Sequence, residues 1–326
     1  MKQTCQNAGR LDAVMSEVLN LPRNQVEKLI KTVGVTLNGV RVFKSGLKVH
    51  VGDTIEYDFI EAAPSAPEYP VDFEVPILYE DDDILVVNKP PFLTVHGAPS
   101  VKEATLVDWL KHKGVSLSSI SGEERHGIVH RIDKETSGAL VVAKNNEAHV
   151  ALASQLEDKS MGRYYIALID VPLKENTIVE LPIGRHLNHR LKMGVLKEGR
   201  YAKSAFAKLA LSKNAKCELI AAKLFTGRTH QIRVHLSALS RHILGDSLYG
   251  FKSQNGTIPR IMLHAYCVYL IHPRSGQSVS IQAPLWDDMN AYLTDHFMKD
   301  EINEKITLDG IVSCFSSHDH WMRKNA

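Results

Sequence analysis

The stretch His130-Arg-Ile-Asp-Lys-Glu-Thr-Ser-Gly138 carries more information than any other part of this 326-residue chain. It places one carboxylate, Asp133, near Arg131 and ahead of a short Thr-Ser-Gly turn. A second run, Thr226-Gly-Arg-Thr-His-Gln-Ile-Arg-Val-His235, contains arginine and histidine but no acid. Together the two runs indicate an acidic catalytic group in a cationic cleft that acts on a polyanion. Either run alone is also compatible with a solvated loop.

The first run resembles the signature of the RluA/RluD-type pseudouridine synthases, His-Arg-Leu-Asp-x-x-Thr-Ser-Gly, with Ile132 in place of the leucine. The segment 79–90 resembles the strand that opens the catalytic domain of that family. Further similar blocks follow in the family's order: Thr226 to His235, Gly245-Asp246, Leu248-Tyr249-Gly250, Leu263-His264-Ala265 and His272-Pro273. The resemblance covers about residues 10–290. It implies an isomerase that acts on RNA uridine and needs no cofactor.

Composition sets the outer limits of the prediction. The chain is 44% hydrophobic and 23% charged, which is typical of a soluble globular protein, and its length fits one large domain plus a module. The net charge of +2 means that any RNA-binding surface must come from local clustering. No signal peptide or membrane-spanning run is present, so we expect a cytoplasmic protein that does not bind membranes.

The four cysteines are far apart and predict free thiols in a reducing compartment. Cys314, His318 and His320 together offer three possible metal ligands in a terminal tail. A fourth ligand is missing from this tail, so we expect no metal site there.

Residues 9–62 predict a small α/β module of their own. Apolar residues at helical spacing follow Leu11 and again Val26, and 34–39 predicts a short strand closed by an Asn-Gly turn. The segment 23–48 has six basic residues against one acid. It resembles the S4-like RNA-binding module, although a solvated charged surface is the alternative. The RNA-binding residues that we predict in it are Arg23, Lys28, Lys31 and Lys44.

The remaining chain predicts a linker, a catalytic domain and a tail, in an α+β protein. Prolines at 64, 67 and 70 predict a semi-rigid linker over 63–74. Short strands and helices then alternate over 75–295, in the mixed, mainly antiparallel domain that the resemblance implies. Apolar runs predict strands at 84–87 and 139–143, and 217–224 alternates like a half-buried strand. Thr229 is a candidate helix cap. The tail, 296–326, shows no clear pattern.

The reaction implied by the resemblance needs a carboxylate near the sugar. It would act as a nucleophile or remove a sugar proton, and the sequence leaves both routes open. The resemblance assigns this role to Asp133, with Arg233 as the cation that keeps it ionised. The alternative is that Arg233 binds phosphate and Asp133 pairs elsewhere.

Three further roles are implied for residues near these runs. Tyr165 matches the tyrosine that packs on the target base, whereas Tyr164 should face the other way on a strand. The target base must flip out of the RNA, and Arg131 matches the residue that enters the vacated stack; a phosphate contact is the alternative. The remaining RNA-binding residues predicted at these runs are His130 and Arg228.

A basic stretch at 185–208 predicts an RNA track, since it has seven basic side chains against one acid. The favoured function is therefore isomerisation of uridines in large-subunit ribosomal RNA, free or in a pre-ribosomal particle, with no obligate protein partner. A transfer-RNA pseudouridine synthase and a non-catalytic ribosome-assembly factor are the alternatives.

Overall fold

The structure of the protein is a computed structural model that describes residues 2–19, 23–57, 69–98, 100–120, 125–252 and 258–316. The chain forms two compact units, which we call the small and the large unit. The small unit holds Met1–Val71 and His96–Ile128, and the large unit holds Asp72–Val95 and Val129–Ala326. The predicted catalytic domain, 75–295, includes 96–128, which the structure places in the small unit. The domain limits from the sequence stay a prediction, and most of the predicted linker, like His318 and His320, lies outside the described residues.

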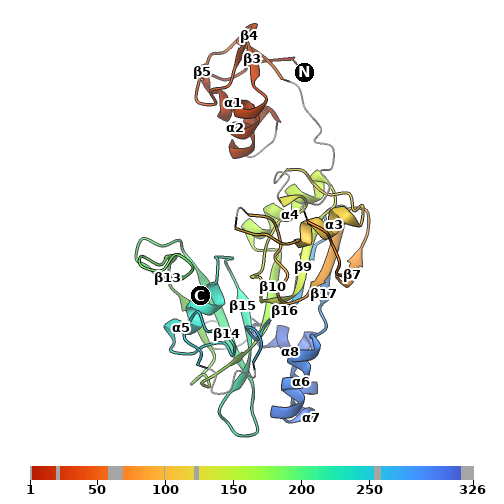
Figure 1. The fold of residues 1–326 in the computed structure, drawn as a ribbon, viewed down its shortest axis with the longest axis vertical. Coiled ribbons are helices and arrows are strands. Elements are labelled where there is room, and N and C mark those ends of the chain that lie inside the picture. Colours follow the sequence, from red (N-terminus) through yellow and green to blue (C-terminus); the bar gives the residue numbers. More distant parts are fainter. Residues whose placement is uncertain are drawn as a thin grey trace. The chain divides into compact units, whose positions relative to one another are not determined.

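The small unit begins with two helices and a four-stranded sheet, drawn in the colours of the start of the chain in Figure 1. Its elements are β1 (Lys2–Thr4), β2 (Gly9–Arg10), α1 (Leu11–Leu19), α2 (Arg23–Thr32), β3 (Val35–Leu37), β4 (Val40–Val42), β5 (Lys48–Val49) and β6 (Thr54–Glu56). The sheet order is β1-β6-β3-β4, and β2 pairs with β5. Both helices and the strand of the predicted module are confirmed. At the Asn-Gly turn, Asn38 and Gly39 both have positive φ, 49° and 84°, as a tight hairpin requires.

One further helix, α3 (Leu106–His112), lies in the small unit. Thr105 caps it: its hydroxyl accepts a hydrogen bond from the Asp108 backbone, and the Asp108 carboxylate accepts one from the Thr105 backbone. This reciprocal capping box satisfies two backbone donors at the helix start.

The large unit is built on a nine-stranded sheet. Its strands are β7 (Ile77–Glu80), β8 (Ile84–Lys89), β9 (Ser137–Ala143), β10 (Gly162–Ile169), β11 (Thr177–Glu180), β14 (Lys203–Leu211), β15 (Glu218–Leu224), β16 (Leu263–Ile271) and β17 (Ser278–Gln282). The order is β11-β14-β15-β10-β16-β9-β8-β7, with β17 also paired to β16. All pairs are antiparallel except β16 with β9. The expected α+β class with a mixed, mainly antiparallel sheet is confirmed.

The parallel pair explains the glycine of the His130–Gly138 motif. Gly138 has φ +113° and lies opposite Ala265 on β16. A Cβ at this position would approach the Ala265 carbonyl oxygen to 2.3 Å, so only glycine fits. This close approach fixes the strand that directly follows the Asp133 turn.

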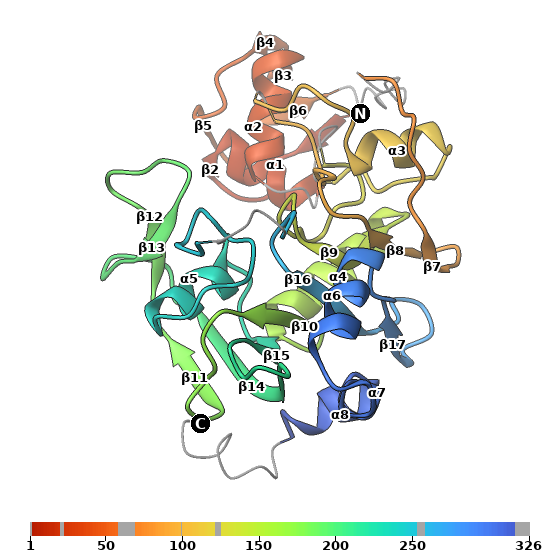
Figure 2. The same ribbon diagram turned by 60° about the horizontal axis from the view of Figure 1, so that its bottom comes forward.

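Helices and a small hairpin complete the large unit. They are α4 (Asn146–Asp158), β12 (Ile183–Arg185), β13 (Met193–Val195), α5 (Gln231–Ala238), α6 (Asp287–His296), α7 (Lys299–Lys305) and α8 (Leu308–Ser313). Figure 2 shows α6, α7 and α8 grouped together. The tail therefore folds as far as residue 316: Ile311 and Phe315 are buried, and the Tyr266 hydroxyl donates to the Ile306 carbonyl.

Two local predictions were wrong. The residue that caps α5 is His230, with φ 57°, and not Thr229. The turn before α5 is held instead by the Gln231 side chain, whose oxygen accepts from the Arg228 backbone. Strand β15 is real but not half-buried, since its first five residues are all buried. Even Glu218 is only 1% exposed, and its carboxylate accepts a hydrogen bond from the Leu173 backbone.

Within the described residues no helix is long and apolar enough to cross a membrane. All four cysteines are free thiols, as the sequence analysis predicts, and only Cys314 is partly exposed.

Candidate active site

A cavity of about 370 Å³ lies in the large unit, where the two motif runs meet. This volume is within the range of roughly 300–1,000 Å³ that is usual for small-molecule sites. Six of the ten site residues predicted from the sequence line it: His130, Arg131, Asp133, Tyr165, Arg228 and Arg233. The other four belong to the small unit.

The Asp133 carboxylate is held by an arginine that is itself held from behind. Nη1 of Arg233 donates to Asp133 Oδ2 at 2.9 Å. Nε and Nη2 of the same guanidinium donate to Asp246 Oδ2 and Oδ1 at 2.8 and 2.9 Å. Arg233 and Asp246 are 6% and 1% exposed, whereas Asp133 is 19% exposed and faces the cavity. The fork between Arg233 and Asp246 therefore fixes the nitrogen that contacts Asp133.

Asp246 was part of a family block in the sequence analysis, but no role was predicted for it. Asp246 lies 13 residues after Arg233, and no local sequence pattern connects the two. They meet because the chain that follows α5 returns to Arg233. The ring of Tyr249 also lies against the guanidinium, with the Arg233 Cζ 4.9 Å from its centroid.

The turn that carries Asp133 is braced by a buried lysine. Nζ of Lys89, at the end of β8, donates to the carbonyls of Pro90, Leu93 and Lys134. Burial lowers the pKa of Lys89 to about 7, and the nearby Asp133 opposes this shift. With all three donors bound to backbone, Lys89 ties β8 to the residue after Asp133.

His230 lies beside Asp133 and connects it to the β12–β13 hairpin. Its Nε2 is 3.8 Å from Asp133 Oδ2, and its Nδ1 is 2.9 Å from the Tyr249 hydroxyl. The Tyr249 hydroxyl accepts from the Met193 backbone nitrogen at 2.8 Å. Burial lowers the pKa of His230, so the ring is neutral at neutral pH.

Tyr165 lines the cavity, and Tyr164 does not. The Tyr164 ring instead stacks on Phe315 of the tail at 5.7 Å and lies near Tyr269. Burial raises the pKa of Tyr165, which keeps its phenol protonated at neutral pH. Tyr165 therefore presents a neutral phenol ring to the cavity.

His130 is buried, and burial lowers its pKa well below the usual value, so it is neutral. Its Nε2 accepts a hydrogen bond from the Val141 backbone, which assigns the ring proton to Nδ1. Among the described residues Nδ1 has no partner, and neither has the buried hydroxyl of Thr136, which lines the same cavity. Both atoms can hydrogen bond to a polar ligand.

The two remaining arginines of the predicted site, Arg131 and Arg228, also line this cavity. Arg131 is exposed and lines the cavity beside Asp133. Arg228 is half-buried, and its Nε donates to the Tyr201 carbonyl at 2.9 Å.

Two of the seven basic side chains in the stretch 185–208 contact other parts of the protein. Arg185, Arg190 and Lys192 lie in or next to the loop of the β12–β13 hairpin. Lys203 pairs with Glu180, and Lys208 donates to the Leu173 carbonyl and lies 3.6 Å from Glu218. The two lysines on β14 therefore serve protein contacts.

The small unit offers fewer free cations than the sequence count indicated. Arg23 pairs with the buried Asp12 at 3.2 Å, and Lys31 pairs with Glu27 at 2.8 Å. Lys44 is exposed beside the exposed Phe43. The side chain of Lys28 lies outside the described part of the chain.

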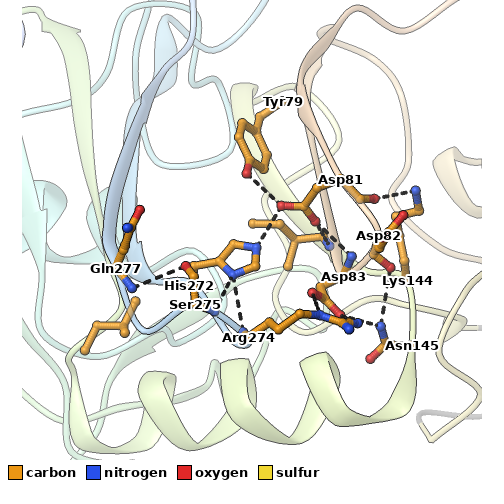
Figure 3. Close-up of polar contacts among 12 residues, drawn as sticks. Tyr79, Asp81, Asp82, Asp83, Lys144, Asn145, His272, Arg274, Ser275 and Gln277 are labelled. Carbon is orange, nitrogen blue, oxygen red and sulfur yellow. Dashed lines mark hydrogen bonds and ion pairs between the residues drawn. The ribbon is translucent and has the colours of Figure 1, made fainter.

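A second polar cluster joins the β7–β8 turn to the β16–β17 turn (Figure 3). Asp81, Asp83 and His272 lie close enough to share a metal ion. However, Asp81 already accepts bonds from the Tyr79 hydroxyl, His272 and two backbone nitrogens. Both oxygens of Asp83 are bound by Arg274 at 2.6 Å. The cluster is therefore best explained as a clamp between two turns.

We expect the clamp to make the large unit sensitive to acid. The hydrogen bonds from Arg274 lower the pKa of Asp83 to about 2. Because this pKa lies below the ordinary value of about 4, the stabilisation is present above pH ~4 and is lost as the pH falls towards ~2. Arg274→Met should flatten the fall in melting temperature over this window. The exposed Lys216→Met is the control, and an unchanged acid profile in Arg274→Met would contradict the clamp.

Two family models match the chain. Residues 83–238 match the model described as RNA pseudouridylate synthase, and residues 9–55 match the S4 domain. Among solved structures, the chain is similar to human RNA pseudouridylate synthase domain containing 1, with a TM-score of 0.57 and 24% identity. That match covers 74% of this chain and 94% of the human one, and it supports the fold.

Curated relatives match over almost the whole length. An uncharacterized RNA pseudouridine synthase of Helicobacter pylori is 48% identical over 316 residues, which is 94% of this chain and 95% of that protein. A protein of Zymomonas mobilis named ribosomal large subunit pseudouridine synthase D is 37% identical over 86% of this chain and 91% of its own length. Another protein of that name, from Nitrosomonas europaea, is 41% identical over 67% of this chain and 64% of its own.

Proposed function

Because the chain belongs to the RNA pseudouridine synthase family and contains an S4 domain, we propose that its target uridines lie in large-subunit ribosomal RNA and that Asp133 carries the reaction. Two relatives named as large-subunit synthases support this substrate. An RNA-binding S4 domain also favours a large RNA over a short stem-loop.

The reaction is an isomerisation, so no atom is gained or lost. The bond from uracil N1 to C1′ of the ribose breaks, the base turns, and C5 bonds to C1′. The proton that leaves C5 is balanced by one that N1 gains. Asp133 would either attack C1′ or remove a sugar proton, and both routes need an ionised carboxylate within reach of the sugar.

The arrangement around Asp133 carries the proposal. Its carboxylate faces the cavity and accepts a hydrogen bond from Arg233 at 2.9 Å, which orients it. Tyr165 offers a neutral ring for the base, and His130 Nδ1 and Thr136 offer hydrogen bonds. Arg131, which lines the cavity, would fill the gap left in the RNA stack by the flipped base.

Mapping pseudouridines in total RNA tests the substrate. Cells that lack the gene should lose specific large-subunit sites, and the wild-type gene should restore them. The gene for Asp133→Asn should not. Loss of sites only in transfer RNA would overturn the ribosomal assignment.

The S4 module predicted at 9–62 is expected to supply affinity, and not chemistry. Deleting residues 1–62 removes the exposed Lys44 and its neighbours, so fewer phosphates are neutralised. The slope of log affinity against log salt should become shallower, by about 0.7–0.9 for each lost contact. Turnover of a short RNA at saturating concentration should persist. An unchanged slope would mean that the S4 domain does not touch this RNA.

A further inference from the structure

A second cavity of about 280 Å³ adjoins the first one in the large unit. The two share part of their lining, namely Leu156, Arg163, Leu224 and Gly227. Because the two cavities adjoin, an RNA strand with a uridine in the first cavity can place a flanking phosphate in the second. The chemistry of the second cavity therefore bears on how the strand is held.

Arg163 is the feature that needs an explanation. It is 8% exposed, and its Nε has no hydrogen-bond partner among the described residues. Two other arginines of this unit are as deeply buried, and each faces a carboxylate: Arg233 faces Asp246, and Arg260 faces Asp288. A buried guanidinium without a counter-ion is costly, so a binding anion would offset that cost.

Geometry directs Arg163 towards the shared wall. Its Nη2 is 3.4 Å from the position that a Cβ would occupy at Gly227. Since Gly227 has no side chain, the guanidinium is open to both cavities at this point.

Two further cations, Lys159 and Lys223, line the second cavity among mainly apolar and aromatic residues. Lys223 lies with its Nζ 5.6 Å from the Tyr164 ring centroid and 5.4 Å from that of Phe225, and Lys159 is exposed at the edge. No acid lines this cavity, and none of the ion pairs in the described part of the chain involves Lys159 or Lys223. Three cations without an acid form a site for an anion.

We propose that the second cavity is a phosphate subsite, in which Arg163 and Lys223 bind one phosphodiester of the strand beside the target uridine. The proposal rests on the proposed function only in that an RNA uridine enters the first cavity. It does not depend on which RNA supplies the uridine. A bound phosphate would satisfy Arg163 and hold the strand while the base is turned.

Neutral phosphate analogues test the subsite. The probe is a short RNA around whichever uridine the mapping assigns, with a methylphosphonate at one flanking linkage at a time. For wild-type protein, one position should weaken binding about tenfold, as expected for loss of a charged hydrogen bond. Arg163→Gln should bind unmodified RNA about tenfold more weakly and show no further loss at that position. Its salt slope should fall by about 0.7.

Four further measurements complete the test. Arg163→Lys keeps the charge and should restore part of the sensitivity to that linkage. Lys223→Gln, at a half-buried position, repeats the experiment if Arg163→Gln does not fold, and the exposed Lys216→Gln should behave like wild type. Free inorganic phosphate should not relieve the methylphosphonate loss. Equal losses at every linkage in wild type, Arg163→Gln and Lys223→Gln would overturn the subsite. A target in transfer RNA would refute the ribosomal assignment and leave the subsite standing.

Discussion

Asp133→Asn should abolish uridine isomerisation, with a loss of at least about 10⁴-fold in kcat. The amide is nearly isosteric but can neither attack C1′ nor remove a sugar proton. RNA affinity should stay equal or increase, because the change removes a negative charge from a cavity that also holds Arg131, Arg228 and Arg233. Single-turnover conversion and equilibrium binding of the same RNA measure the two effects separately.

The matched control is Asp158→Asn. Asp158 is exposed at the end of α4, outside both cavities, and its carboxylate accepts a hydrogen bond from the Ser160 backbone that an amide oxygen can also accept. It should keep activity within about twofold, as surface changes usually do. Conversion by Asp133→Asn near the wild-type rate would remove this motif from the chemistry.

The sequence was sufficient to predict those helices, strands and turns that depend on a local pattern. Helical spacing gave α1 and α2, and Asn38-Gly39 gave a hairpin because both residues tolerate positive φ. Apolar runs gave β8 and β9. The proximity of Asp133 and Arg233, a hundred positions apart, came only from the family resemblance. No local rule connects them.

The features that the sequence did not predict depend on tertiary contacts. Asp246 and Lys89 hold the site from behind, but a buried acid and a lysine at the end of a strand look ordinary in a sequence. The tail lacked periodicity because its helices are short. It packs through tertiary contacts, namely Phe315 stacked on Tyr164, the buried Ile311 and the hydrogen bond from Tyr266 to the Ile306 carbonyl. The count of basic residues was a poor guide at Lys203 and Lys208, since both meet carboxylates on the neighbouring strands β11 and β15.

Arg233→Leu should lower both the stability and the activity of the protein, and a second substitution should separate the two effects. The single variant leaves the Asp246 carboxylate, 1% exposed, without its cation, so we expect a stability loss of about 3–5 kcal/mol. The double variant Arg233→Leu/Asp246→Asn removes that buried charge and should regain most of the stability. Its amide oxygen can still accept the hydrogen bond that Asp246 takes from the Tyr249 backbone.

Activity should not recover in the double variant, because Asp133 still lacks the Arg233 nitrogen at 2.9 Å. We expect kcat to stay down at least about 100-fold in both variants, as for removal of one charged group that acts on the reacting carboxylate. Arg233→Lys should be intermediate, since one ammonium cannot bind Asp246 through two nitrogens and also reach Asp133.

Comparing the change in kcat with the change in RNA affinity shows what Arg233 does. The measurements are melting curves, single-turnover rates and binding constants for the two variants. A double variant that regains stability and activity together would limit Arg233 to a role in the fold. A fall in RNA affinity with kcat unchanged would make Arg233 a phosphate clamp. If Arg233 orients Asp133, the double variant should be stable and bind RNA normally, but its kcat should stay low. In that variant only the reacting carboxylate lacks its partner.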